Sequence, residues 1–319
     1  MTLPLLVING PTASGKSSLA IEVALALRER GVPSEIVNSD SMLIYRGMDI
    51  GTAKPRAAEL TLVKHHLVNC CEVTQPASVA EFQKQAREII AELREREVLP
   101  VLVGGSALYV HAILDEFSFP GTDPRVRARY EDRLAQLGAE ALHAELAQRS
   151  PVVAAGILPG NGRRIVRALE VLELTGGFTP TLPEWSYAVA GVLQFGLELD
   201  RETMDRRIDE RVEQMWADGL VAEVEALVPQ GLRDGLTASR ALGYRQVLQF
   251  LDGELTEHEA RERTKSGTRK FARKQLGWFR RDPRIVWLAA GDPTNAETIV
   301  AAALSALDGV DPELGDVEQ

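Results

Sequence analysis

The chain has 319 residues, enough for one large domain or two smaller ones with a substantial hydrophobic core. Its formal net charge is −10, which on average argues against nucleic acid as a partner. We find no secretory signal, no apolar run of membrane-spanning length, and only two cysteines, Cys70 and Cys71. We therefore expect a cytoplasmic protein with no membrane partner, in which both cysteines are buried and reduced.

The first motif along the chain is a phosphate-binding loop. Residues 5–9 form a short apolar run that predicts a buried strand, and residues 18–30 have the pattern of a helix. Between them, residues 10–17 read GPTASGKS and fit the pattern G-x-x-x-x-G-K-[ST] in full. In such loops the backbone N–H groups and the helix N-terminus attract a phosphate anion, while the lysine supplies a point charge.

Strand and helix patterns continue to alternate through the first third. Residues 35–38 predict a second strand that ends at Asp40, and residues 65–71 could be another extended segment. Ser78 to Glu81 form a capping box at the start of a helix, and residues 98–103 predict a strand that ends in Gly-Gly-Ser. Repeated strand–helix units indicate a parallel sheet, with ligands at the carboxyl ends of its strands.

The middle of the chain has only helical patterns, from residue 125 to residue 175. Strand patterns return at residues 191–199 and 284–288. We therefore predict an α/β protein with a P-loop NTPase-like parallel sheet core, flanked by helices and carrying an inserted all-helical subdomain. The predicted boundaries are 1–118 for the first part of the core, 119–190 for the insertion, and 191–319 for the rest of the core with basic C-terminal helices.

Two positions at the predicted sheet edge carry chemistry. A nucleotide hydrolase or kinase normally has an acidic Mg²⁺ ligand after an apolar strand, but the strand at residues 98–103 ends in Gly104, Gly105 and Ser106. Asp40 is the better candidate, because a carboxylate near bound phosphate would serve either as a Mg²⁺ ligand or as a general base. The simpler alternatives are a turn-capping role for Asp40 and a plain strand-to-helix turn at Ser106.

Residues 40–55, DSMLIYRGMDIGTAKP, resemble the signature of bacterial tRNA dimethylallyltransferases, the tRNA isopentenyltransferase family. The likeness covers nearly the whole chain. It continues through His65-His66-Leu67, Gly104-Gly105-Ser106-Ala107-Leu108-Tyr109, residues 163–171, residues 241–245 and residues 269–284. One departure is Ser106, where the family more often has threonine; the hydroxyl is kept, so we expect the same role.

The resemblance implies alkyl transfer from dimethylallyl diphosphate to the exocyclic N6 of the adenosine immediately 3′ of the anticodon in tRNA. It implies that Asp40 is the general base, with Lys16 and Ser106 as further catalytic residues, and that Ser17 helps to hold Mg²⁺. The diphosphate would lie on the phosphate loop. Its expected contacts are Gly10, Thr12, Ala13, Ser14, Gly15, Lys16 and Ser17.

The resemblance also implies a tRNA surface, against the indication of the average charge. The expected contacts are Asp40, Ser41, Met42, Leu43, Ser106, Arg127, Arg163, Arg164, Ile165, Val166 and Arg167. A second basic segment, residues 261–284, has ten Lys or Arg against two acids, and we expect its aromatic residues to belong to the core. His65 and His66 are interpreted as structural or substrate-adjacent, and we expect a monomer.

Three alternatives stay open from the sequence. The first is a small-molecule P-loop kinase, and the second is a P-loop RNA-binding module without catalysis. The third is an isopentenyltransferase that acts on free adenine nucleotides. The missing acid after Val103 disfavours the kinase, and a binding module would not need Asp40.

Overall fold

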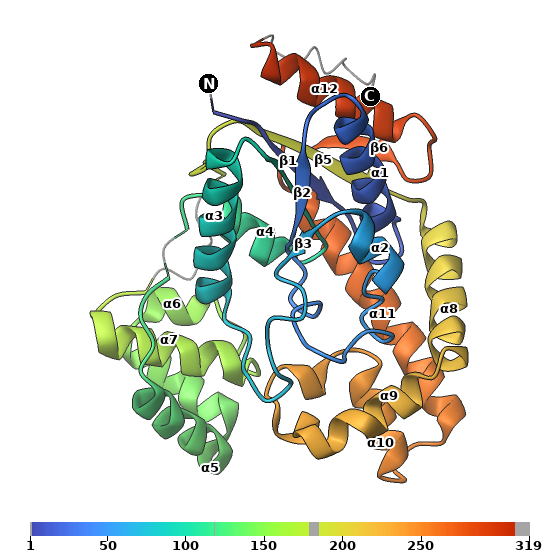
Figure 1. Cartoon of the computed structure of the whole chain (residues 1–319). Helices are drawn as coiled ribbons and strands as arrows, with labels where there is room; N and C mark the ends of the chain where they lie inside the picture. Colours follow the sequence, from blue (N-terminus) through green and yellow to red (C-terminus); the bar gives the residue numbers. More distant parts are fainter. Residues whose placement is uncertain (1, 118, 179–184, 310–319) are drawn as a thin grey trace. The chain divides into compact units, whose positions relative to one another are not determined.

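The computed structural model describes residues 2–117, 119–178 and 185–309 (Figure 1). It divides into two compact units. The core unit comprises residues 1–115 and 187–319, and the inserted unit comprises residues 116–186.

Among its described residues, the core unit contains one parallel sheet of six strands in the order β3-β2-β4-β1-β5-β6 (Figure 1). The strands are β1 (Leu5–Asn9), β2 (Ser34–Asn38), β3 (His65–His66), β4 (Leu99–Gly104), β5 (Val192–Glu198) and β6 (Val286–Ala289). The parallel sheet predicted from the sequence is thus confirmed. The extended segment expected at residues 65–71 shortens to two residues, because Leu67 and Asn69 adopt φ angles of 57° and 55°.

Nine α-helices of the core unit lie in its described residues. They are α1 (Lys16–Glu29), α2 (Ala57–Leu62), α3 (Val79–Glu95), α4 (Ala107–Leu114), α8 (Arg201–Ala217), α9 (Leu220–Leu227), α10 (Tyr244–Leu251), α11 (Glu257–Phe279) and α12 (Asn295–Leu307). Three short 3₁₀ turns separate α9 from α10, at η1 (Val228–Gln230), η2 (Leu232–Asp234) and η3 (Ala238–Arg240).

Successive side chains of a strand point to opposite faces of the sheet, and both faces are buried under helices. Leu6 and Ile8 of β1 pack in a core with α1 and α12, whereas Leu5 and Val7 pack in a core with α3, α4 and the C-terminal helices. A strand buried on both faces reads as a continuous apolar run, which is why β1 and β4 are recognisable in the sequence.

The basic segment at residues 261–284 lies largely on α11, and acidic residues of α8 form ion pairs with part of it. Arg269 contacts Asp209 at 2.6 Å, and Lys265 contacts Glu213 at 2.6 Å. The basic side chains of α11 therefore form ion pairs that hold it against α8 within the core unit. The expectation that its aromatic residues are buried is wrong for Phe271, whose exposed fraction is 43%.

The inserted unit is helical, with α5 (Pro124–Arg149), α6 (Pro151–Ala155) and α7 (Gly162–Thr175). Tyr130, Leu142 and Leu146 of α5 pack against α7 in a separate small core. At Gly138 the φ angle of 82° interrupts α5 with a kink, a conformation that favours glycine.

The inserted unit joins the core through two neighbouring residues, Asp115 and Tyr187. They form an antiparallel bridge, and Arg284 binds both carboxylate oxygens of Asp115 at 2.6 and 2.9 Å. The same guanidinium lies 3.8 Å from the centre of the Tyr187 ring. These contacts keep both residues in the core unit, so we correct the predicted boundaries at 118/119 and 190/191 to 115/116 and 186/187.

No helix in the described part of the chain is both long enough and apolar enough to cross a membrane. Both cysteines are free thiols. Cys71 is half-buried, but Cys70 is exposed, so the expectation that both are buried is wrong.

Candidate active site at the phosphate loop

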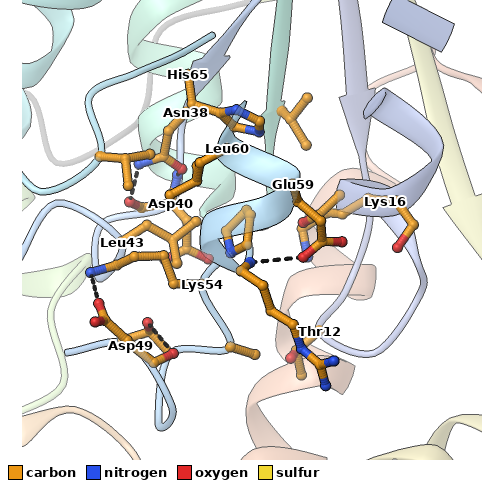
Figure 2. Close-up of a pocket in the computed structure, with 18 of the residues that line it drawn as sticks. Thr12, Lys16, Asn38, Asp40, Leu43, Asp49, Lys54, Glu59, Leu60 and His65 are labelled. Atoms are coloured by element: carbon orange, nitrogen blue, oxygen red, sulfur yellow. Dashed lines mark hydrogen bonds and ion pairs between the residues drawn. The ribbon is translucent and has the colours of Figure 1, made fainter. Parts of the chain in front are cut away.

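A cavity of about 770 Å³ lies in the core unit beside the carboxyl ends of β2 and β4 (Figure 2). Its wall includes the phosphate loop, the segment from Asn38 to Leu43, residues 49–57 and one face of α8, together with residues of α2, of the segment 65–69 and of the end of β4. The parallel topology explains this, because loops that follow parallel strands meet at one edge of the sheet.

The phosphate loop runs from the end of β1 into the first turn of α1. Gly15 has a φ of 87°, and Ala13 also has a positive φ of 64°, which a residue with a Cβ rarely adopts. Gly10 is needed for space, because a Cβ there would lie 2.7 Å from the Ser14 Oγ. The result is a tight loop at a helix N-terminus, which is a general anion-binding arrangement.

Lys16 lines the cavity, and its Nζ donates a hydrogen bond to the carbonyl of Pro11 at 3.3 Å. Burial lowers the pKa of Lys16 to about 8, against the opposing effect of the Asp40 carboxylate; Arg211 lowers it further. An ammonium that is partly desolvated in this way gains strongly from a bound anion.

Asp40 follows β2 in a turn that the side chain of Asn38 shapes. The Oδ1 of Asn38 accepts the N–H of Asp40 at 2.8 Å, and its Nδ2 donates to the Asp40 carbonyl at 2.9 Å. The Oδ1 of Asp40 then accepts the N–H of Met42 at 3.0 Å. Asp40 is thus a turn-capping residue, and its half-buried carboxylate also lines the cavity, so the two interpretations from the sequence are compatible.

Ser106 occupies the N-cap position of α4, without a capping hydrogen bond from its side chain, and lies next to the segment from Asn38 to Leu43. Its Oγ is 3.4 Å from the Oγ of Ser41 and accepts the N–H of Ser41 at 3.4 Å. The approach requires Gly104, where a Cβ would lie 2.2 Å from the Oγ of Ser39. The strand ends of β2 and β4 therefore bring Ser106 into contact with Ser41, the residue that follows Asp40, at one edge of the sheet.

Arg211 on α8 is a site residue that the sequence analysis missed. Its Nη1 lies 3.5 Å from the Oγ1 of Thr12, and burial lowers its pKa against the opposing charge of Asp40. Arg207, one helical turn earlier, also lines the cavity. Two arginines four residues apart on the helix after a predicted strand are the signal that could have pointed to this face.

Residues 49–54 form another wall, and a carboxylate from α9 anchors it. Glu223 accepts the backbone N–H groups of Asp49, Ile50 and Gly51 at 3.0, 2.7 and 3.3 Å. Lys54 is buried on the inner side of this wall, where its Nζ donates to the Asp49 Oδ1 at 2.5 Å (Figure 2). Burial lowers the pKa of Lys54, although Asp49 opposes the shift. The middle of the signature is therefore a fixed wall of the cavity.

The residues present fit a magnesium ion that is held jointly with a phosphate ligand. Mg²⁺ in proteins commonly uses few side chains together with substrate phosphates and waters. Ser17 lines the cavity at the loop, and no cluster of three His, Cys, Asp or Glu occurs among the described residues. The Ser17 hydroxyl is the kind of donor that a phosphate loop offers to such a shared ion.

The two histidines differ in their surroundings. His66 contacts the Oε2 of Glu35 at 2.6 Å, away from the residues that line the cavity. His65 lines the cavity, and its Nδ1 lies 2.8 Å from the carbonyl of Val63. Burial lowers the pKa of His65, which favours the neutral form of its ring.

The arginines predicted to contact tRNA lie in the inserted unit and fall into two groups. Arg163 and Arg164 are exposed at the start of α7. Arg127 and Arg167 contact the buried carboxylate of Glu170 at 2.6 and 2.9 Å. Two further predicted residues, Ile165 and Val166, have exposed fractions of 0% and 3%, so their side chains build the core of this unit rather than its surface.

Comparison with known proteins gives a family for the chain. The model of the IPP transferase family matches residues 43–282, which is well over half of the sequence. The chain belongs to this family. The match begins within the Asp40 segment and ends beyond α11, so it includes much of the cavity wall.

Proteins similar to this chain match it over nearly its whole length. A protein of Cutibacterium acnes named tRNA dimethylallyltransferase is 55% identical over 307 residues, covering 96% of both chains. A protein of Thermobifida fusca with the same name is 58% identical over 287 residues, covering 90% of both chains. The crystal structure of a tRNA isopentenylpyrophosphate transferase from Bacillus halodurans is 35% identical, with a TM-score of 0.69, and covers 96% of this chain and 98% of its own.

A eukaryotic dimethylallyltransferase acting on tRNA has the same fold, with a TM-score of 0.80 over 97% of this chain and 80% of its own. Its sequence is 23% identical. The core fold of the family is therefore kept at low sequence identity.

Proposed function

We propose that this protein is a tRNA dimethylallyltransferase that alkylates N6 of the adenosine 3′ to the anticodon. One observation carries the proposal: the cavity joins a phosphate loop to the Asp40 carboxylate, while Gly104, Gly105 and Ser106 stand where a nucleotide hydrolase has its acidic residue. The names of the bacterial relatives support the choice of tRNA and of the prenyl group.

In this mechanism the N6 nitrogen attacks C1 of dimethylallyl diphosphate. The N6–C1 bond forms as the C1–O bond breaks, the electron pair of that bond leaves with the diphosphate, and Asp40 accepts the proton that N6 loses. A base is needed because the amine lone pair is delocalised into the adenine ring, so N6 is a weak nucleophile until its proton is removed.

Lys16, Arg211 and the N–H groups of the loop would hold the diphosphate and stabilise the charge that develops on it. Ser17 would hold Mg²⁺ against the diphosphate, where the ion supplies further charge neutralisation. Ser106 and Ser41, adjacent to Asp40, would orient the acceptor nucleotide. Arg163 and Arg164 would contribute phosphate contacts, with the enzyme acting as a monomer.

The test is a transfer assay with Mg²⁺, labelled dimethylallyl diphosphate and either unmodified tRNA or AMP. We expect label in tRNA and none in AMP. Label in AMP alone would instead assign the protein as an adenylate isopentenyltransferase. Isopentenyl diphosphate is the matched donor control, because it carries the same diphosphate but lacks the allylic double bond that stabilises positive charge at C1.

A further inference from the structure

Gln275, on α11, links the phosphate loop to the turn that carries Ser106. Its Oε1 accepts the backbone N–H of Thr12 at 3.0 Å, and its Nε2 donates to the carbonyl of Gly105 at 2.7 Å. The side chain is buried, with an exposed fraction of 5%. Its partners fix the orientation of the amide, because a flipped amide would oppose N–H to N–H and oxygen to oxygen.

The hydrogen bond from Gln275 leaves no room for a side chain at Gly105. A Cβ at Gly105 would lie 2.6 Å from the Gln275 Nε2 and 3.0 Å from the carbonyl oxygen of Gly10. The loop, the Gly105 turn and the glutamine therefore meet in direct contact, and a shift of one moves the others.

Both hydrogen bonds have consequences for the site. The N–H of Thr12 is paired with Gln275, and that of Ser14 donates to the Pro11 carbonyl at 3.3 Å, so a diphosphate is left with the other N–H groups of the loop. The carbonyl of Gly105 immediately precedes Ser106, whose hydroxyl contacts Ser41 beside Asp40. The amide therefore connects the phosphate loop directly to the turn that precedes Ser106.

We propose that Gln275 is a positioning residue that fixes the phosphate loop relative to the Ser106 turn without itself touching the substrate. The proposal rests on the proposed transfer reaction. The positioning role goes beyond that reaction, because it assigns the placement of the phosphate loop relative to the Ser106 turn to one amide from the C-terminal part of the chain.

The test uses Gln275→Glu and Gln275→Leu in the full-length protein. Glu keeps an acceptor for Thr12 but turns an oxygen toward the Gly105 carbonyl, and Leu removes both hydrogen bonds at similar volume. We expect KM for dimethylallyl diphosphate to rise and kcat to fall, each by about tenfold or more, because small misplacements of reacting groups are costly. KM for tRNA should stay unchanged in both variants.

The matched control is Gln246→Leu. Gln246 is a glutamine with an exposed fraction of 2%, and its Oε1 accepts the N–H of Gly243 at 2.9 Å at the start of α10. It shares the burial and the chemistry of Gln275 but not its place in the site. We expect a comparable loss of Tm with no selective change in the donor KM.

A second measurement keeps the proposal testable if one variant folds poorly. Gly105→Ala places a Cβ against the same amide, so it should reproduce the donor defect while Gln275 is intact. Binding of Mg²⁺-pyrophosphate, followed by calorimetry, should weaken in parallel in all three site variants. Wild-type donor KM and pyrophosphate affinity in Gln275→Leu would overturn the inference, as would an equal donor defect in the Gln246→Leu control.

The two proposals fail in different ways. If the wild-type protein labels AMP but not tRNA, the proposed acceptor is wrong, yet the pyrophosphate titrations still test Gln275. If the wild-type protein prenylates tRNA and the Gln275 variants match it, only the positioning role is wrong.

Discussion

Asp40 shows how one side chain serves the turn and the chemistry together. One carboxylate oxygen accepts the N–H of Met42, which holds the turn after β2, while the group as a whole lines the cavity with Lys16. A substitution that removes the whole side chain would confuse these two roles. The charge has to be removed while the oxygen that accepts the Met42 N–H is kept.

Asp40→Asn meets that requirement, because an amide oxygen can still accept the N–H of Met42 but cannot take a proton from N6. We expect kcat to fall by about 10²- to 10⁴-fold, the usual contribution of a general base. KM for tRNA and the affinity for Mg²⁺-pyrophosphate should remain near wild type. Steady-state prenylation kinetics and calorimetry measure these quantities, and a kcat near wild type would refute the base role.

Lys16 makes a prediction about pH. Its pKa of about 8 in the free protein rises when a diphosphate binds, since the anion favours the ammonium form. Donor affinity should therefore be complete below about pH 8 and decline as the pH rises above it, by up to tenfold per pH unit. The Kd of Mg²⁺-pyrophosphate between about pH 7 and 9 measures this. Lys16→Arg is the control, because arginine stays charged and its affinity should not decline.

The residues of this site differ in how visible they are in the sequence. Lys16 and Asp40 lie within or next to short motifs whose spacing is set by local backbone geometry. Arg211 and Gln275 lie on helices whose register against the sheet depends on packing across the whole core; the spacing of Arg207 and Arg211 is a weak local signal, and Gln275 has none. Gln275 is 263 residues from its partner Thr12, so only the folded chain identifies the contact.

At the scale of elements, the strands were the more predictable part because burial on both faces gives them continuous apolar runs. The roles of the basic helices were less predictable. Arginines with similar spacing have three different roles. On α11 they pair with acidic residues of α8, within the inserted unit they bind Glu170, and at the start of α7 they are exposed. The charge of each helix can be read from its sequence, but which helix packs beside it cannot.

The buried Glu170 carboxylate binds residues near the start of the inserted unit, which leads to a prediction about the stability of this unit. The carboxylate accepts the Oγ1–H of Thr122 at 2.6 Å and contacts Arg127 and Arg167, which lower its pKa to about 2 despite burial. Its stabilising effect is therefore complete above the unfolded pKa of about 4.3 and disappears as the pH falls toward 2.

Glu170→Gln should thus lower the free energy of unfolding of this unit by roughly 1.5–3 kcal/mol at neutral pH, through loss of charge-assisted hydrogen bonds. The difference from wild type should shrink below about pH 4 as the wild-type carboxyl is protonated. Urea denaturation at several pH values measures both. Glu173→Gln, at a more exposed ion pair with Arg129, is the matched control and should cost less.

For the whole molecule, the sequence predicted an insertion but placed its ends three and four residues too far along the chain. The predicted ends follow the proline and glycine residues, which are typical of loops. The actual ends are set by the Arg284 contacts with Asp115 and Tyr187, which come from a distant segment.

The close pairing of those ends allows the two units to be tested separately. Replacing residues 116–186 with a two-residue glycine turn should leave the core folded, because Asp115 and Tyr187 already lie side by side as in a hairpin. We expect unchanged affinity for Mg²⁺-pyrophosphate and a KM for tRNA at least about tenfold higher, through lost phosphate contacts. A shortened protein that prenylates tRNA with wild-type KM would show that the inserted unit does not bind the acceptor.

The link from Gln275 to Thr12 also bears on protein synthesis. The phosphate loop leaves the ribosome first, but β1 lacks its partner β5 until residue 198 has been made, and the loop lacks its glutamine until residue 275. The inserted unit is continuous in sequence and can fold before either arrives. A nascent chain therefore carries a complete inserted unit well before its phosphate loop has the contact with Gln275, so we expect donor binding only after almost the entire chain has been translated.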